Sequence, residues 1–333
     1  MIEASAPRRI ALIDVIRGGA LIAMMIFHGA WDVSYFRIIR FDPGASIGWI
    51  IFARAIAGTF LALVGVSLVL STRNGFKLHA YLRRLAMVAG AAALVSIATY
   101  FVLPQGWVFF GILHQILIAS VLALPFLRLP PLVTLVSAAF IFVVPFAFRH
   151  PIFAFPALWW VGLAPESPPS FDYVPVFPWF GVVLAGLALG RFGVDQGWDR
   201  RLARWTPRFA IGRLLDFGGR HSLAVYLIHQ PVLYAFFFAV AHLFMPNAAE
   251  DAARADCADR CVVLGNSAEG CQSYCACVFD GLKASKLLAP LLDGSMTPEQ
   301  TDRLRETAGL CTAKTLPAVP PARTNGDEPA ETN

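Results

Sequence analysis

Long apolar runs alternate with short polar segments along most of the chain. Seven of these runs are each close to the roughly 20 residues that a helix needs to cross the core of a bilayer. The runs cover residues 10–36, 47–71, 81–103, 107–127, 130–148, 177–194 and 220–245. The pattern therefore predicts an all-α fold, a polytopic helical membrane bundle of about seven transmembrane helices.

The rest of the chain divides into a loop and a tail. Residues 149–176 are broken by prolines and rich in Phe, Trp and Tyr, which is typical of a loop at the membrane interface. We expect a transmembrane domain over 1–246, a small helical tail over 247–316 and a disordered C-terminus over 317–333. Small-residue faces such as Gly186/Gly190 permit close helix packing, either within one chain or in a homo-oligomer.

Composition and charge point to the membrane as well. The chain is 57% hydrophobic and 15% charged, whereas a soluble domain carries about 25% charged residues. Lys and Arg gather at the N-terminus, in 73–84, at Arg128 and in 191–220, on one side of the predicted topology. This places the N-terminus in the cytoplasm and the tail outside a bacterial inner membrane. The basic loops predict contacts with membrane lipids or an anionic ligand, and they are too short and scattered for nucleic acid.

All the cysteines of the chain lie in the tail. They are Cys257, Cys261, Cys271, Cys275, Cys277 and Cys311. An even number of cysteines in a segment that faces an oxidising compartment favours disulfides. The twin C-x3-C spacing, with Gly265-Asn266 between, is compatible with two short helices cross-linked as a hairpin. Metal binding and free thiols are the alternatives, and we expect no metal site.

The first predicted span carries four ionisable residues, Asp14, Arg17, His28 and Asp32. At 100° per residue they fall within about 60° of one another on the helix surface. Such a stripe must face protein, water or a substrate. His28 lies near the outer end, and Asp32 at i+4 is placed to orient its ring, as a general base requires. Asp14 and Arg17 lie near the inner end, either as a structural ion pair or as part of a site.

Other spans add polar residues. Arg54 and the pair His114-Gln115 fall at a depth similar to that of His28, which predicts one polar layer. In the seventh span, Arg220 and His229 lie toward the cytoplasm, where the Arg-rich loop is suited to an anionic phosphate-bearing ligand. Helix packing and positive-inside topology are the alternative explanations. The sequence motifs of common soluble enzymes are absent.

Five ordered blocks of the sequence resemble a known family. The blocks are RRIALIDVIRGGALIAMMIFHGAWD, FARAIAGTFLALVGVSLVLS, FGILHQILIAS, FPWFGVVLAGLALGR and GGRHSLAVYLIHQPVL. Together they are similar to bacterial relatives of the heparan-α-glucosaminide N-acetyltransferase catalytic domain, a family of integral-membrane acyltransferases. The resemblance covers about residues 8–235, and the Cys-rich tail lies outside it.

The resemblance implies a reaction and a set of residues. It implies transfer of an acetyl or other acyl group from cytoplasmic acyl-CoA to an extracytoplasmic sugar or amino sugar, with acetyl-CoA as co-substrate and no permanently bound cofactor. His28 matches the active-site histidine of the family. The polar positions of the family match Arg17, Arg54, His114 and His229.

Two other functions are compatible with the sequence. Intramembrane His, Asp and Arg residues also build proton relays, so a proton-coupled small-molecule transporter is the main alternative. No inverted repeat is visible to support it. The third reading is a membrane anchor that presents the cysteine hairpin to a partner.

Overall fold

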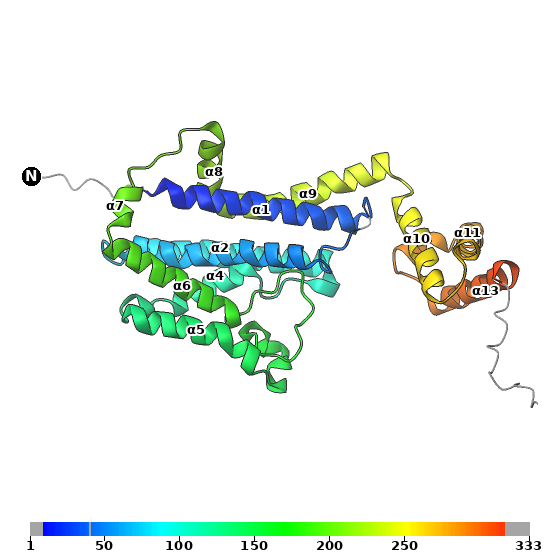
Figure 1. The fold of residues 1–333 in the computed structure, drawn as a ribbon, viewed down its shortest axis with the longest axis horizontal. Coiled ribbons are helices and arrows are strands. Elements are labelled where there is room, and N and C mark those ends of the chain that lie inside the picture. The colour runs from blue at the N-terminus through cyan, green and yellow to red at the C-terminus, as the bar shows by residue number, and fades with distance from the viewer. Residues whose placement is uncertain (1–8, 40, 317–333) are drawn as a thin grey trace, which may run out of the picture. The chain divides into compact units, whose positions relative to one another are not determined.

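The computed structural model describes residues 9–39 and 41–316, which form helices and loops without any strand (Figure 1). The chain divides into two compact units. The first contains Met1–Asp32 and Asp42–Phe236, and the second contains Val33–Phe41 and Phe237–Asn333. The all-α prediction is therefore confirmed for the described residues.

Five helices are long and apolar enough to cross a membrane. They are α1 (Ala11–Tyr35), α2 (Ile47–Thr72), α3 (Leu78–Val102), α6 (Val176–Asp195) and α9 (Ser222–Phe244). Each coincides with a predicted span to within about three residues. The protein is thus an integral membrane protein, as its composition indicates.

The predicted span over 107–127 is not a continuous helix. The helix found there, α4 (Ile112–Leu122), has 11 residues, which gives about 16 Å of length. The residues before it form backbone hydrogen bonds with a distant loop, since Phe171 donates to Gly106 and Val174 donates to Phe110. The strand-like pairing with that loop competes with helix formation, a contact that hydropathy does not detect.

The neighbouring apolar helix is also short. Helix α5 (Pro131–Ala147) has 17 residues, or about 25 Å, and is followed by the Pro-rich segment. That segment contains two 3-10 helices, η3 (Pro151–Ala154) and η4 (Pro156–Val161). It does not span, as predicted. Two further 3-10 turns, η1 (Pro104–Gly106) and η2 (Pro125–Leu127), flank α4.

The core of the first unit lies between α2, α5 and α6, which run side by side in Figure 1. Glycines let the backbones meet. A Cβ on Gly65 of α2 would lie 2.1 Å from the carbonyl oxygen of Val183, and one on Gly186 of α6 would lie 2.1 Å from that of Ala62. Gly181 approaches the backbone of α5 in the same way. The small-residue faces noted in the sequence are therefore used within the chain.

Helix α8 packs on the first turns of α1 through a second pair of glycines. A Cβ on Gly18 would lie 2.1 Å from the carbonyl oxygen of Leu215, and one on Gly219 would lie 1.8 Å from that of Asp14. Helix α7 (Trp198–Leu202) and helix α8 (Ala210–Arg220) connect α6 to α9. Both lie at the end of the unit where α1 begins (Figure 1).

The second unit is built on four helices after the last span. They are α10 (Ala248–Val263), α11 (Ala268–Ala284), α12 (Leu288–Leu292) and α13 (Pro298–Thr315). Helices α10 and α11 form a hairpin, with Gly265 at φ +92° in the turn. Three disulfides link this unit, and they are Cys257–Cys275, Cys261–Cys271 and Cys277–Cys311. The expected disordered segment 317–333 lies outside the described residues.

Gly186→Ala should destabilise the bundle, because its methyl group meets the backbone of Ala62 and the helices must separate. Strain of this kind costs about 1–3 kcal/mol. Gly58→Ala on α2 is the matched control, since nothing lies within 4 Å of its Cβ position. At position 58 the better helix propensity of alanine should raise the free energy of unfolding by as much as about 1 kcal/mol. Thermal unfolding in detergent tests both, and equal shifts would contradict the assigned contact.

Replacing Cys277 and Cys311 together by serine should loosen α13. The disulfide closes a loop with a sequence separation of 34, for which loop-closure entropy gives about 3–4 kcal/mol. Hydrogen exchange should increase in α13 and stay unchanged in α6. Unchanged exchange in α13 would show that the disulfide does not stabilise this helix.

Candidate active site

Two histidines from distant parts of the sequence meet inside the first unit. The ring centroids of His28 on α1 and His229 on α9 lie 5.1 Å apart. The sequence analysis assigned His28 to the outer end and His229 to the cytoplasmic half, and this separation in depth is wrong because the two rings meet. Nδ1 of His229 lies 2.6 Å from the carbonyl oxygen of Tyr226, so this nitrogen carries the proton and donates it. Nε2 of the neutral ring is then an acceptor, and it is buried without a partner among the described residues. The backbone of α9 thus orients a basic nitrogen beside His28.

The same two helices also carry a carboxylate, Asp32 on α1, and an amide, Gln230 on α9, which follows His229 directly. Gln230 Nε2 donates to Asp32 Oδ1 at 3.0 Å, and Asp32 is only 3% exposed. The second oxygen of Asp32 and the amide oxygen of Gln230 have no partner within the described ranges. In the same ranges no hydrogen bond joins Asp32 to His28. Asp32 is therefore held by Gln230 here, whereas the sequence analysis expected it to orient the ring of His28.

His114 is engaged by its surroundings in α3 and α4. The backbone N–H of Gly111 donates to Nδ1 at 3.2 Å, and Nε2 lies 3.2 Å from Ser96 Oγ. Since Nδ1 accepts, Nε2 is the protonated nitrogen and donates to Ser96. His114 thus caps α4 and connects it to α3. Gln115 is fully buried, and neither of its amide atoms has a partner in the described part of the chain.

The three predicted arginines lie in separate surroundings. Arg17 forms an ion pair with Asp14 at 3.0 Å and donates to Ser67 of α2. This agrees with the interpretation of Asp14 and Arg17 as a structural ion pair. Arg220 forms an ion pair with Asp216 at 2.6 Å. Arg54 is exposed on α2. Of the residues predicted from sequence, the structure therefore brings together His28, Asp32 and His229.

Sequence reasoning missed two residues of this region, Asp172 and Tyr226. The carboxylate of Asp172 accepts the N–H of Ile112 at 2.9 Å and the hydroxyl of Tyr226. Burial raises the pKa of Asp172 above its usual value, and these two hydrogen bonds oppose that rise. The Tyr226 ring lies 5.6 Å from that of His229. The i,i+3 spacing of Tyr226 and His229 is visible in the sequence, but the loop residue Asp172 gives no such signal.

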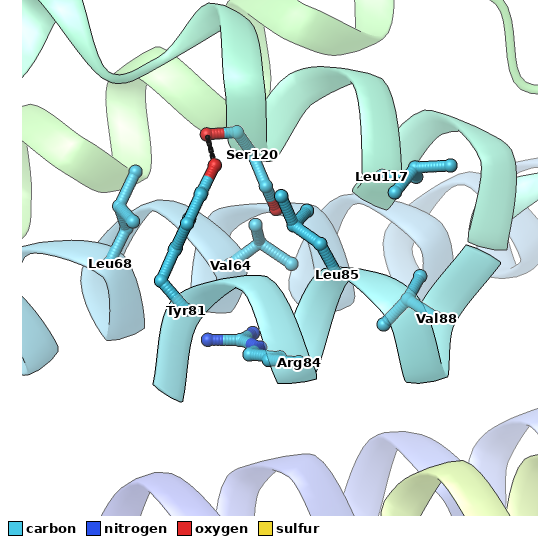
Figure 2. A pocket seen from close by; sticks show the side chains of 8 residues that line it. All are labelled: Val64, Leu68, Tyr81, Arg84, Leu85, Val88, Leu117 and Ser120. Carbon is cyan, nitrogen blue, oxygen red and sulfur yellow. Dashed lines mark hydrogen bonds between the residues drawn. The ribbon is translucent and has the colours of Figure 1, made fainter. Parts of the chain in front are cut away.

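A small pocket lies elsewhere in the unit, between α2, α3 and α4 (Figure 2). Its walls are mainly leucine and valine side chains, and the hydroxyl of Tyr81 donates to the carbonyl oxygen of Ser120 at 3.0 Å across one side. Arg84 lines it and is close enough to Arg17 for their charges to interact.

The fold and the histidine pair define a class, an integral-membrane helical bundle with an ionisable site between its first and last spans. No cluster that suits a metal ion is found among residues 9–39 and 41–316. The model of the heparan-alpha-glucosaminide N-acetyltransferase catalytic family matches residues 9–231. The chain belongs to this family, and membership implies a membrane acetyltransferase. Neither a curated protein nor a solved structure matches the chain significantly.

Asp172→Ala should destabilise the first unit, because Ile112 N–H and the Tyr226 hydroxyl both lose their acceptor. We expect the free energy of unfolding to fall by about 1–3 kcal/mol. Tyr226→Phe alone should lower the free energy of unfolding by less than Asp172→Ala does. In the Asp172→Ala background it should lower it no further. The measurement is thermal unfolding of the four proteins. Glu166→Ala, an exposed acid in the same loop, is the control, and additive effects would contradict the shared hydrogen bond.

Proposed function

We propose that the protein transfers an acetyl or other acyl group from cytoplasmic acyl-CoA to an extracytoplasmic sugar or amino sugar. The observation that carries this proposal is the set of unpartnered polar atoms at the histidine pair. Asp32 Oδ2, His229 Nε2 and Gln230 Oε1 are all buried hydrogen-bond acceptors. A buried acceptor without a donor is costly, so a ligand or water that donates to it is favoured.

The chemistry of these atoms restricts the acceptor substrate. A molecule with several hydroxyl groups, or hydroxyl groups and an amine, presents several donors to neighbouring acceptors. Saccharides have this property, whereas an apolar alcohol offers one donor. Family membership supports the same class of substrate. We therefore assign Asp32 and Gln230 to binding the saccharide and the histidine pair to its reacting group.

The proton balance requires a base at this site. When the acceptor oxygen or nitrogen attacks the thioester carbon, a C–O or C–N bond forms and the C–S bond of acyl-CoA breaks. The proton of the acceptor moves to a histidine nitrogen, and a proton is returned to the CoA thiolate. His229 Nε2 is free to accept it, and His28 lies beside it at the position of the family's active-site histidine.

We place the donor at the basic end of the unit. The CoA phosphates need cationic groups, and Arg17, Arg84 and Arg220 are spread over α1, α3 and α8 near this end. The positive-inside rule makes it the cytoplasmic end. The disulfide-linked unit is then extracytoplasmic, where disulfides persist. In this assignment His114 supports α4, and Arg54 is a candidate contact for the acceptor.

His28→Ala and His229→Ala should each abolish acyl transfer while the proteins remain folded. Loss of a general base costs roughly 10²–10⁴ in rate. The assay follows CoA thiol release from acetyl-CoA by protein in nanodiscs, with its disulfides intact, against a panel of amino sugars and polyols. Asp32→Asn should weaken acceptor binding more than it lowers the maximal rate.

The control is His242→Ala, an exposed histidine of the same helix α9. It should retain activity. Wild-type turnover in His28→Ala would refute the assigned mechanism. If the wild-type protein moves saccharides or protons across vesicles without consuming acetyl-CoA, the transporter reading is correct instead.

A further inference from the structure

Helix α8 has two different faces. One face packs on α1, where Leu215, Asp216 and Gly219 meet its first turns. The other face consists of Phe217, Leu214 and Ile211, spaced three residues apart and therefore aligned along the helix. These side chains are 61%, 67% and 74% exposed, and Phe209, just before the helix, is 83% exposed. No described residue covers this face.

Exposed arginines lie in the segment before α8 and on α8 itself. Arg201, Arg204, Arg208 and Arg213 are exposed, and none forms an ion pair with an acid of the described chain. The nearby Arg220 differs, because Asp216 neutralises it at 2.6 Å. Trp205, 42% exposed, lies between the arginines. Trp at this position is typical of the boundary between acyl chains and head groups.

A helix with a strongly apolar face, a basic polar side and little overall hydrophobicity lies in the plane of a membrane interface. We propose that the surface formed by Phe209, Ile211, Leu214, Phe217 and these four arginines binds anionic phospholipid of the leaflet at the basic end. The acyl chains cover the apolar face, and the guanidinium groups bind the phosphate head groups. A soluble phosphate ligand would account for the arginines and leave the apolar face exposed.

The location of the surface gives the lipid an effect on the rest of the unit. Helix α8 is locked to α1 by the two backbone contacts at Gly18 and Gly219. Asp14, at the second contact, pairs with Arg17, which donates to Ser67 of α2. A lipid that holds α8 in place therefore stabilises the inner end of α1, the helix that carries His28. The inference does not depend on the acyltransferase proposal, because it is tested by lipid retention.

The test is native mass spectrometry of the full chain in detergent, titrated with phosphatidylglycerol or with phosphatidylcholine of the same acyl chains. The wild type should retain phosphatidylglycerol preferentially. Replacing Arg201, Arg204, Arg208 and Arg213 together by Gln should remove the preference, since each basic residue near an anionic surface contributes roughly fivefold. The control replaces Arg260, Arg303, Arg305 and Lys314 by Gln, which removes the same charge from the second unit, and should retain the preference.

Two further arms separate lipid from free phosphate. Phe209→Ser with Phe217→Ser should reduce retention of phosphatidylglycerol and leave CoA binding unchanged. Adding CoA should not displace the lipid from the wild type. Equal retention of the two lipids, an unaffected arginine variant, or displacement of the lipid by CoA would each overturn the proposal.

Discussion

The hydrocarbon core of a membrane offers no water to a polar side chain, so each polar group on a spanning helix needs a partner within the protein. Many of the polar residues in the first unit meet this requirement within their own helix, as when the Ser120 hydroxyl donates to the carbonyl oxygen of Ile116. Others join two helices. Arg17 connects α1 to α2 through Ser67, and His114 connects α4 to α3 through Ser96. These bonds fix how the helices are rotated relative to one another. The buried atoms that remain without a partner among the described residues include both amide atoms of Gln115 as well as acceptors at Asp32, His229 and Gln230.

The same requirement determines where the site lies. Gln230 binds Asp32 through its amide nitrogen, which leaves the amide oxygen and one carboxylate oxygen unpaired on neighbouring residues. The carbonyl oxygen of Tyr226 accepts a hydrogen bond from His229 Nδ1–H, and Nε2 of the same ring has no partner among the described residues. The backbone and side chains of α9 thus orient these acceptors, although His28 is on α1. Tyr226 is itself fixed by Asp172 from the loop before α6.

The ends of the spanning helices could be predicted closely because they depend on the hydropathy of consecutive residues. The α1, α2, α6 and α9 boundaries follow from apolar runs that end at Pro, Gly or charged residues. The failure at 107–127 has a non-local cause at its start, where Val174 N–H donates to the carbonyl of Phe110, and a local one at its end, where Pro125 begins the 3-10 turn η2. Helical spacing identified the stripe on α1. It could not show that Gln230, 198 residues away from Asp32, is the residue that binds this carboxylate.

A relay of protons and a site for acyl transfer both need ionisable groups inside a bundle, but they need them in different arrangements. A relay needs successive groups that each donate to the next, so that a proton has a continuous path. Here the N–H of His229 donates a hydrogen bond to the backbone carbonyl of Tyr226, which has no proton to donate to a further group. Asp32 Oδ2, His229 Nε2 and Gln230 Oε1 remain buried acceptors without a donor among the described residues. Such an arrangement is suited to bind a molecule rich in hydroxyl or amino groups and to remove one of its protons, which is the requirement of acyl transfer.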